Sequence, residues 1–188
     1  MKSGMSALTR KFKAVIAPLK KKEESAAIAA AKAYLGKDLS DHFRVFGADL
    51  RIDKPQGPRK APARMIGVLV VDYGNRRNFE VVVEPGGKVV RMDDLGGAQP
   101  AYTIEEIEEA RSIAEQDVRV ARFAKRKRVF VSDFGPERAS DNARRIGLRY
   151  AVLGKGRSAE LLAHAVVDLS VRKLVSFDER AAATQPGR

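Results

Sequence analysis

Two stretches of the chain share one pattern, and this pattern is typical of a β-hairpin. Residues 79–94 read FEVVVEPGGKVVRMDD, and residues 163–179 read AHAVVDLSVRKLVSFDE. Each stretch has a β-branched run, a carboxylate, a short turn and a second apolar run that ends in acidic residues. A strand, a tight loop and a returning antiparallel strand need this pattern. The sequence therefore predicts one β-hairpin in each half of the chain.

The similarity between the two halves extends beyond the hairpins. RVFGADL (44–50) aligns with RVFVSDF (128–134) at a shift of 84 residues, and VVE (82–84) aligns with VVD (166–168) at the same shift. Residues between these segments align at a shift of 80: Arg64, Ile66, Gly67 and Gly74 with Arg144, Ile146, Gly147 and Gly154. The kept order and spacing indicate an internal duplication. Chance similarity is the alternative, because valine-rich runs are common in sheets.

Each copy is expected to contain a helix followed by four strands. The alanine-rich residues 23–36 predict the first helix, which ends at Gly36. In the second copy Thr103 and Glu106 form a capping box, and Asp117 begins a short second helix over 118–126. The expected strands are 43–52, 63–73, 77–84 and 88–93, then 128–134, 144–153, 159–168 and 172–178. This order predicts α+β units, each a helix packed on a four-stranded antiparallel sheet.

The spacing of apolar residues predicts the buried side chains. Alternation along the first hairpin points Phe79, Val81 and Val83 inward. Val167 and Leu174 are also expected to be buried, and Lys88 and Arg172 to be exposed. One apolar stripe is expected along the second copy's helices, at helical spacing: Ile104, Ile107, Ala110, Ala114, Val118 and Ala121.

These patterns divide the chain into five segments. They are a basic N-terminal segment (1–22), a first α+β unit (23–95), a linker (96–102), a second α+β unit (103–179) and a tail (180–188) that we expect to be disordered.

Positive charge is concentrated in two segments. The formal net charge is +12, and residues 1–22 carry seven bases and no acid, while residues 119–128 carry six bases and no acid. Such clusters suit a polyanion, although they also serve solubility or a helix C-terminus. The candidate polyanion-binding residues are Lys20, Lys21, Lys22, Arg119, Arg122, Lys125, Arg126, Lys127 and Arg128. Only 12 Phe and Tyr residues are present, with no Trp, so stacking platforms for single strands are sparse.

Catalytic and cofactor motifs are not found in the sequence. There is no Cys, so thiolate catalysis, disulfides and Cys-based metal sites are excluded. The sequence contains no phosphate loop, no Gly-x-Ser-x-Gly elbow and no His-Glu-x-x-His helix. No apolar run approaches the ~20 residues of a membrane span. We therefore expect a cytoplasmic protein without cofactor or metal; His42 and His164 are expected to be ordinary surface or strand-end residues.

Three segments resemble the small N-terminal domains of copper amine oxidases. They are the hairpin GKVV (87–90), the linker GAQP (97–100) and the acidic helix start TIEE (103–106). In that family two consecutive domains of cystatin-like fold precede a large catalytic domain, so the resemblance implies two tandem cystatin-like units here.

The catalytic features of that family have no counterpart in this sequence. The family's quinone derives from a Tyr that follows Asn, and none of Tyr34, Tyr73, Tyr102 and Tyr150 does so. Its copper site needs three histidines, and this chain has two. The resemblance therefore implies the fold without the oxidase activity.

Three function classes remain. The first is a non-catalytic protein-interaction or assembly module. The edges of the repeated sheets could pair with a strand of a protein partner or of a second copy of the chain. The alternative is a non-specific nucleic-acid-binding protein that uses the basic segments 1–22 and 119–128. An enzyme with an unrecognised site is third, without positive evidence in the sequence.

Overall fold

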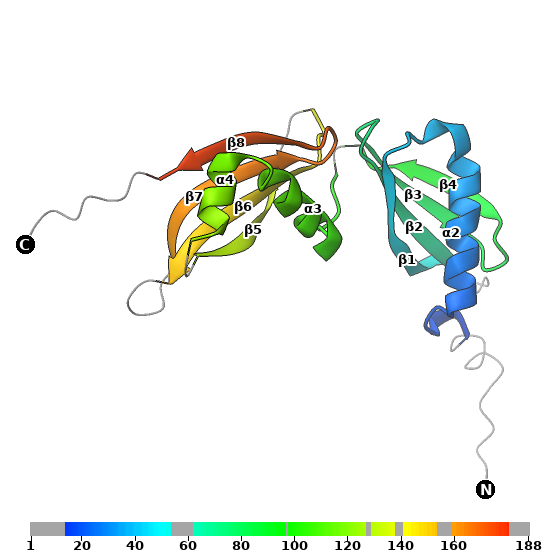
Figure 1. Cartoon of the computed structure of the whole chain (residues 1–188). Coiled ribbons are helices and arrows are strands. Elements are labelled where there is room, and N and C mark those ends of the chain that lie inside the picture. Colours follow the sequence, from blue (N-terminus) through cyan, green and yellow to red (C-terminus); the bar gives the residue numbers. More distant parts are fainter. Residues whose placement is uncertain are drawn as a thin grey trace, which may run out of the picture. The chain divides into compact units, whose positions relative to one another are not determined.

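A computed structural model describes residues 14–53, 62–96, 98–126, 129–137, 141–153 and 159–180. The chain divides into two compact units, Met1–Gly96 and Gly97–Arg188, which are described separately below. Each unit contains one four-stranded antiparallel sheet with its strands in chain order (Figure 1). The predicted α+β class with two antiparallel sheets is therefore confirmed. Among the described helices, none is long and apolar enough to cross a bilayer.

The first unit has one helix lying across its sheet (Figure 1). Its elements are helix α2 (Lys21–Leu35), the 3-10 helix η1 (Gly36–Asp38) and strands β1 (Phe43–Asp53), β2 (Ala63–Asp72), β3 (Arg77–Val83) and β4 (Val89–Asp94). Helix α2 begins two residues before the predicted start and ends at Gly36 as predicted. Gly36 has φ of 44°, a left-handed conformation that glycine adopts without strain.

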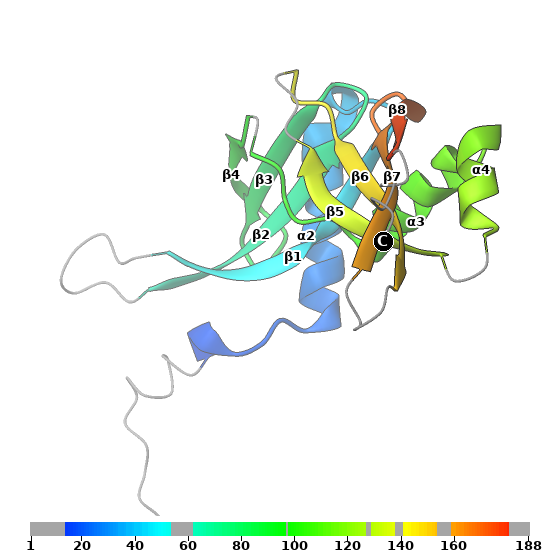
Figure 2. The same cartoon turned by 90° about the vertical axis from the view of Figure 1, so that its left-hand side faces the viewer.

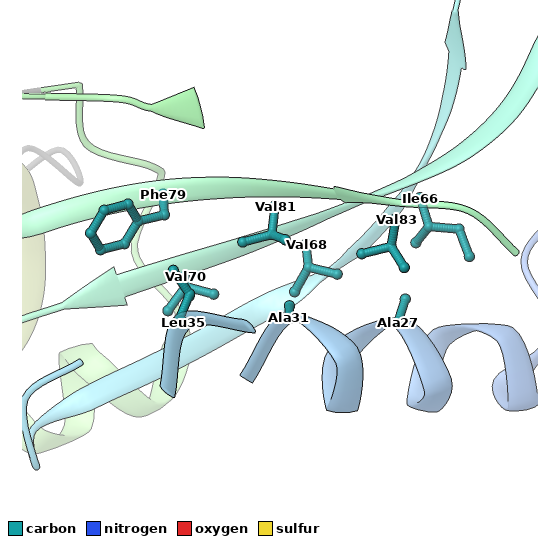
Figure 3. Close-up of a cluster of buried hydrophobic side chains, with 9 residues drawn as sticks. All are labelled: Ala27, Ala31, Leu35, Ile66, Val68, Val70, Phe79, Val81 and Val83. Carbon is teal, nitrogen blue, oxygen red and sulfur yellow. The ribbon is translucent and has the colours of Figure 1, made fainter. Parts of the chain in front are cut away.

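The core of the first unit lies between α2 and the two central strands (Figure 3). One face of the helix contributes small and branched side chains, and β2 and β3 contribute every second residue. The nine buried residues are Ala27, Ala31, Leu35, Ile66, Val68, Val70, Phe79, Val81 and Val83. The inward alternation predicted for β3 is confirmed, since its three predicted residues are at most 1% exposed.

The second unit has two helices on one side of its sheet, as Figures 1 and 2 both show. Its elements are helices α3 (Ile104–Ala114) and α4 (Val118–Ala124) and strands β5 (Val129–Glu137), β6 (Arg145–Leu153), β7 (Ala159–Asp168) and β8 (Lys173–Glu179). Both predicted helix starts are confirmed. Thr103 Oγ1 accepts a hydrogen bond from the Glu106 amide at 3.2 Å, and the Asp117 carboxylate accepts one from the Arg119 amide at 2.8 Å.

The single apolar stripe predicted along α3 and α4 is wrong in part. Ile104 is 72% exposed and Val118 is 67% exposed, whereas Glu106 is fully buried. The reason is an ion pair between Glu106 and a buried arginine of β6, Arg144, which turns the acidic side of the first helical turn inward. Helix α4 is a separate element and buries other residues, among them Phe123.

The predicted strand bounds agree with the structure to within one residue, except at β5. That strand continues to Glu137, three residues beyond the prediction. A register shift between Asp133 and Pro136 lets it pass a proline that donates no hydrogen bond. Of the residues predicted to be buried in the hairpins, Leu174 is half-buried because it lies on the edge strand β8. Lys88 and Arg172 are exposed, as predicted.

Arg144 fixes the second unit's entry segment to its sheet. Its Nε donates to Glu106 Oε1 at 2.9 Å and its Nη2 donates to Glu106 Oε2 at 2.8 Å. The remaining N–H groups donate to Gln99 Oε1 at 3.3 Å, the Pro100 carbonyl at 2.7 Å and the Ala101 carbonyl at 3.2 Å. All five guanidinium donors therefore have acceptors, which is what a buried charge requires.

Arg64 occupies the equivalent place in the first unit. It donates to the carbonyls of Val15, Ala17 and Pro18, and to Glu23 Oε2 at 3.3 Å. Glu23 and Glu106 are both third residues of their helices, and both accept a bond from the backbone N–H of the helix N-cap. The aligned arginines thus perform the same task in both units, and residues 15–18 belong with the first sheet.

Candidate binding surface

The helix-free face of the second sheet carries a row of polar side chains that crosses all four strands. The register pairs Ser132 with Arg149, Arg149 with His164, and His164 with Asp178. Along β6, Leu148 and Tyr150 are fully buried on the helix side, so alternation places Arg149 on the opposite face. Directly paired residues have Cβ atoms about 4.5–5.5 Å apart, so neighbours in this row can act on one ligand.

A hollow of about 300 Å³ lies beside this row. It is lined by Phe130 and Ser132 of β5, Arg149 and Ala151 of β6, and Leu161 of β7. Phe130, Ala151 and Leu161 are paired in register and form the next outward row. The hollow therefore combines one guanidinium and one hydroxyl with three apolar walls. Its volume is at the lower end of the range for ligand pockets.

The equivalent row of the first sheet has a different chemistry. Its register pairs Gly47 with Leu69, Leu69 with Glu80, and Glu80 with Asp93. Leu69 and Glu80 correspond to Arg149 and His164 at the shifts of 80 and 84 residues. The two units therefore share a backbone plan and differ in charge at the same two positions.

Ion pairs lie across this face of the first sheet. Arg51 Nε donates to Glu80 Oε1 at 2.6 Å, and Arg91 Nε donates to Asp93 Oδ2 at 2.9 Å. A second acid, Asp53, lies 3.8 Å from Arg91. The charged side chains of this face are engaged with each other.

Both edges of each sheet are interrupted by a register shift. In the first sheet the shifts fall at Val45/Gly47 on the β1 side and at Val82/Val83 on the β4 side. In the second they fall at Asp133/Pro136 and at Val166/Val167. Bulges of this kind twist an edge strand and oppose pairing with another chain. The sheet edges that the sequence suggested as interaction surfaces are therefore poorly suited to strand addition.

The three candidate lysines of the first unit lie at the start of α2. Lys20 is its N-cap residue, and Lys21 and Lys22 are its first two residues. All three are exposed. The N-terminus of a helix carries partial positive charge, so lysines are unfavourable there. Helix stabilisation does not explain this cluster.

The candidate bases of the second unit differ from one another in their contacts. Arg119 is tied to its neighbour Asp117, with Nη2–Oδ2 at 2.8 Å and Nε–Oδ1 at 3.0 Å. Hydrogen bonds from the Arg119 side chain and amide lower the pKa of Asp117 to about 2, so the pair stays ionised. Arg126 stacks over the ring of Phe123, 3.7 Å from its centroid.

The other bases of this cluster add little to a defined site. Arg122 and Lys125 are exposed at the C-terminal end of α4, where the helix dipole favours positive charge. Lys127 and Arg128 lie outside the described residues.

Ser40, His42 and Asp72 come together at the end of the first sheet but do not form a catalytic triad. The Ser40 hydroxyl donates directly to Asp72 Oδ1. The His42 ring stacks on Tyr73 with the ring centroids 4.6 Å apart. A triad needs histidine between the nucleophile and the acid, and here the serine bonds the acid directly. Asp72 also accepts from the Asn75 amide at 3.2 Å, so this cluster closes a turn.

The two acids at the end of β4, Asp93 and Asp94, are bound to arginines of the same unit. Asp93 binds Arg91, and Asp94 Oδ2 accepts from Arg77 Nη2 at 2.8 Å. Hydrogen bonds from Arg77 and from a backbone amide lower the pKa of Asp94. In the part of the chain that the structure describes, no group of three or more His, Asp or Glu residues could hold a metal ion.

The main features missed by the sequence interpretation are the hollow and the buried Glu106–Arg144 pair. The aligned copies showed only that the two halves differ in charge here, because Leu69 and Glu80 of the first copy align with Arg149 and His164 of the second. Nothing in the spacing indicated that an acid of the α3 capping box points inward.

Comparison with protein-family models gives no match for this chain, and comparison with curated proteins gives no significant match.

Proposed function

We propose that this chain is a non-catalytic protein-binding module made of two tandem cystatin-like units similar to the N-terminal domains of copper amine oxidases. The docking surface is the helix-free face of the second sheet. One observation carries the proposal. Where the first sheet has Leu69 and Glu80, the second has Arg149 and His164, and the apolar side chains of Phe130, Ala151 and Leu161 line a hollow beside Arg149.

The interrupted sheet edges favour a face over an edge as the contact surface. Apolar surface is exposed in this unit, since Phe130 at the wall of the hollow is 37% exposed and Leu153, at the end of β6, is 66% exposed. Apolar side chains around a small polar group are characteristic of interface centres, and single polar anchors there give specificity.

The residues that resemble the oxidase family have a structural role in this chain. Gln99 and Pro100 of the GAQP segment and Glu106 of the TIEE segment all bind Arg144. This supports a likeness in fold and not in chemistry. Purified protein should show no quinone staining and release no peroxide from simple amines with copper added; either activity, kept after metal stripping and reloading, would contradict the non-catalytic proposal.

Affinity capture from lysate with wild-type and variant chains tests the function. Leu161→Asp places a negative charge in the hollow. The control, Val118→Asp, places the same charge at an exposed position of α4, on the helix side of the sheet. We expect protein partners that resist nuclease treatment, are lost with Leu161→Asp and are kept with Val118→Asp. Partners that both variants retain equally would exclude this face.

Nucleic-acid binding is the second candidate function, favoured by the three lysines at the unfavourable end of α2. Bases that neutralise phosphates release counterions, and about six contacts would lower affinity ~10³-fold between 50 and 200 mM salt. Filter binding across a salt series measures this slope. Sub-micromolar affinity at physiological salt would make nucleic acid the function, whereas binding that vanishes there would leave the protein-binding proposal in first place.

A further inference from the structure

We infer that the first unit carries a second binding surface, which places two isoleucines and three lysines against an anionic lipid bilayer. The surface consists of Ile16, Lys20, Lys21, Lys22 and Ile52, all of them exposed, and we call it the Ile–Lys surface. It goes beyond the proposed function, because the docking face of that proposal is in the second unit. The inference follows from the contacts that hold these residues together, from their charge and from their apolar side chains.

The two isoleucines lie beside one anchored arginine, Arg64. Its side chain donates to the carbonyls of Val15 and Ala17, which flank Ile16 in the chain. Ile52 is the partner of Arg64 in the register of β1 and β2, and residues that are paired in this way have side chains on the same face of a sheet. Ile16 is 47% exposed and Ile52 is 46% exposed. Two large apolar side chains are therefore open to solvent around the same guanidinium.

The three lysines belong to the same part of the first unit. Arg64 also donates to Glu23 Oε2 at 3.3 Å, and this oxygen accepts from the backbone N–H of Lys20 at 2.9 Å. Glu23 is thus held between the arginine and the start of α2. The other acid in the first turn of α2 is Glu24, so the three lysine charges of residues 20–22 exceed the acidic charge around them. The exposed isoleucines adjoin a surface of net positive charge.

The combination of bases and aliphatic side chains favours a membrane over a nucleic acid. Residues 1–22 contain seven bases and no acid, and each base near an anionic bilayer strengthens binding about fivefold. At such a bilayer, apolar side chains enter the boundary between headgroups and acyl chains, while lysines keep their charge at the headgroups. Binding to a nucleic-acid backbone depends on neutralising phosphates, to which an isoleucine adds nothing. An anionic lipid surface uses both kinds of side chain, so it is the better match.

Cosedimentation of the full chain with lipid vesicles tests the inference. One set of vesicles contains phosphatidylcholine alone, and the other contains an equal mixture of phosphatidylcholine and phosphatidylglycerol. We expect binding to the mixed vesicles and none to phosphatidylcholine alone, because two half-exposed isoleucines are too small an anchor without electrostatic attraction. Added salt should weaken the binding, since it screens charges at the membrane surface.

A charge variant with a matched control identifies the role of the lysines. Replacing all three lysines of residues 20–22 by glutamine should weaken binding to the mixed vesicles about 100-fold, because three bases are removed. Replacing Arg122, Lys125 and Arg126 by glutamine removes the same charge from exposed positions of the second unit and should leave binding unchanged. Thermal melts equal to that of the wild type show that each variant is folded.

An apolar variant identifies the role of the isoleucines. Ile16→Ser should weaken binding to the mixed vesicles about fivefold, since a half-exposed isoleucine loses its burial in the lipid. The control is Ile104→Ser at the start of α3, where the isoleucine is 72% exposed, and it should bind the vesicles as the wild type does. Neither isoleucine is part of a buried core, so both substitutions leave the fold intact.

Several results would overturn the inference. The chain might not bind the mixed vesicles, or the lysine variant and its charge control might lose binding equally, which would mean that net charge alone attracts the chain. A short DNA duplex that binds the wild type, binds Ile16→Ser equally and is lost with the lysine variant, while vesicles are not bound, would assign the lysines to nucleic acid. Leu161→Asp should bind the mixed vesicles like the wild type, and a loss there would show that the membrane surface is not confined to the first unit.

Discussion

Replacing Glu106 with alanine should destabilise the second unit by about 3–5 kcal/mol. The Glu106 side chain is fully buried and the Arg144 side chain is 2% exposed. Truncation removes the two carboxylate contacts at 2.9 and 2.8 Å and leaves a buried guanidinium without a counter-charge. Breaking a buried pair from one side is costly because the remaining charge has lost its solvent and its partner.

The duplication supplies a matched control. Glu23→Ala removes the equivalent acid of the first unit, whose contact with Arg64 is longer, at 3.3 Å, with side chains 13% and 23% exposed. Because this pair is closer to solvent and its contact is longer, Glu23→Ala should cost less than Glu106→Ala. Both substitutions also remove one hydrogen bond to an N-cap amide, so this contribution cancels and the difference between the two losses reports the burial and the second guanidinium bond of the Glu106 pair.

Urea-dependent hydrogen exchange, read by mass spectrometry, measures both units in one experiment. Peptides from β6 and β7 report the second unit, and peptides from β2 and β3 report the first. The double variant Glu106→Leu with Arg144→Met should recover most of the loss, since apolar replacements of a buried pair are often neutral. Equal losses for Glu106→Ala and Glu23→Ala, or a loss below about 1 kcal/mol at Glu106, would show that the buried pair with Arg144 does not hold the second unit together.

Three further predictions concern single side chains. Val83→Asp puts a lone charge in the core of the first unit, where Val83 is fully buried. Thermal melts should show that the free energy of unfolding falls by about 3–5 kcal/mol. A melt equal to that of the wild type would contradict the assigned strand register. Burial raises the pKa of Asp72, but hydrogen bonds from Ser40 and Asn75 outweigh it and lower the pKa below 3.8. Its stabilising contribution is therefore present above pH 3.8 and lost as pH falls through the lower folded value, so the stability difference between wild type and Asp72→Asn should shrink in acid titrations. Burial raises the pKa of Tyr150 from 10.0 to about 12, and its hydroxyl has no hydrogen-bond partner among the described residues. The stability that comes from keeping this hydroxyl neutral is present below pH 10 and lost as pH rises toward 12. Tyr150→Phe should therefore leave the stability of the second unit unchanged at pH 7 and make it higher than that of the wild type at pH 11. A clear loss of stability at pH 7 would reveal a partner for the hydroxyl.

Local signals in the sequence were sufficient to predict most of the fold. Alternation through Val81 and Val83 predicts both the strand and its buried face, because side chains in a strand have a period of two. Thr103 and Asp117 predict helix starts because their oxygens accept backbone hydrogen bonds that the helix cannot satisfy. These contacts join residues at most three positions apart, so the sequence shows both partners together.

Features that depend on distant residues were beyond such reasoning. Glu106 and Arg144 are 38 positions apart, and neither residue type suggests burial. The hollow draws its walls from three strands, and its existence depends on a register that spacing along one strand does not contain. The edge bulges were missed for the same reason. The Val82/Val83 and Val166/Val167 shifts fall at aligned positions within otherwise regular valine runs.

Photo-crosslinking at Phe130 tests whether the second sheet carries a docking surface. A benzoylphenylalanine at this position keeps an aromatic ring at the wall of the hollow, and the same group at Val118 serves as the control on the exposed side of α4. After irradiation in nuclease-treated lysate, we expect discrete crosslinks to protein from position 130 and none of these bands from position 118. Equal crosslinking from both positions would contradict a docking surface on the second sheet. So would crosslinks from position 130 that form with nucleic acid when nuclease is omitted and never with protein.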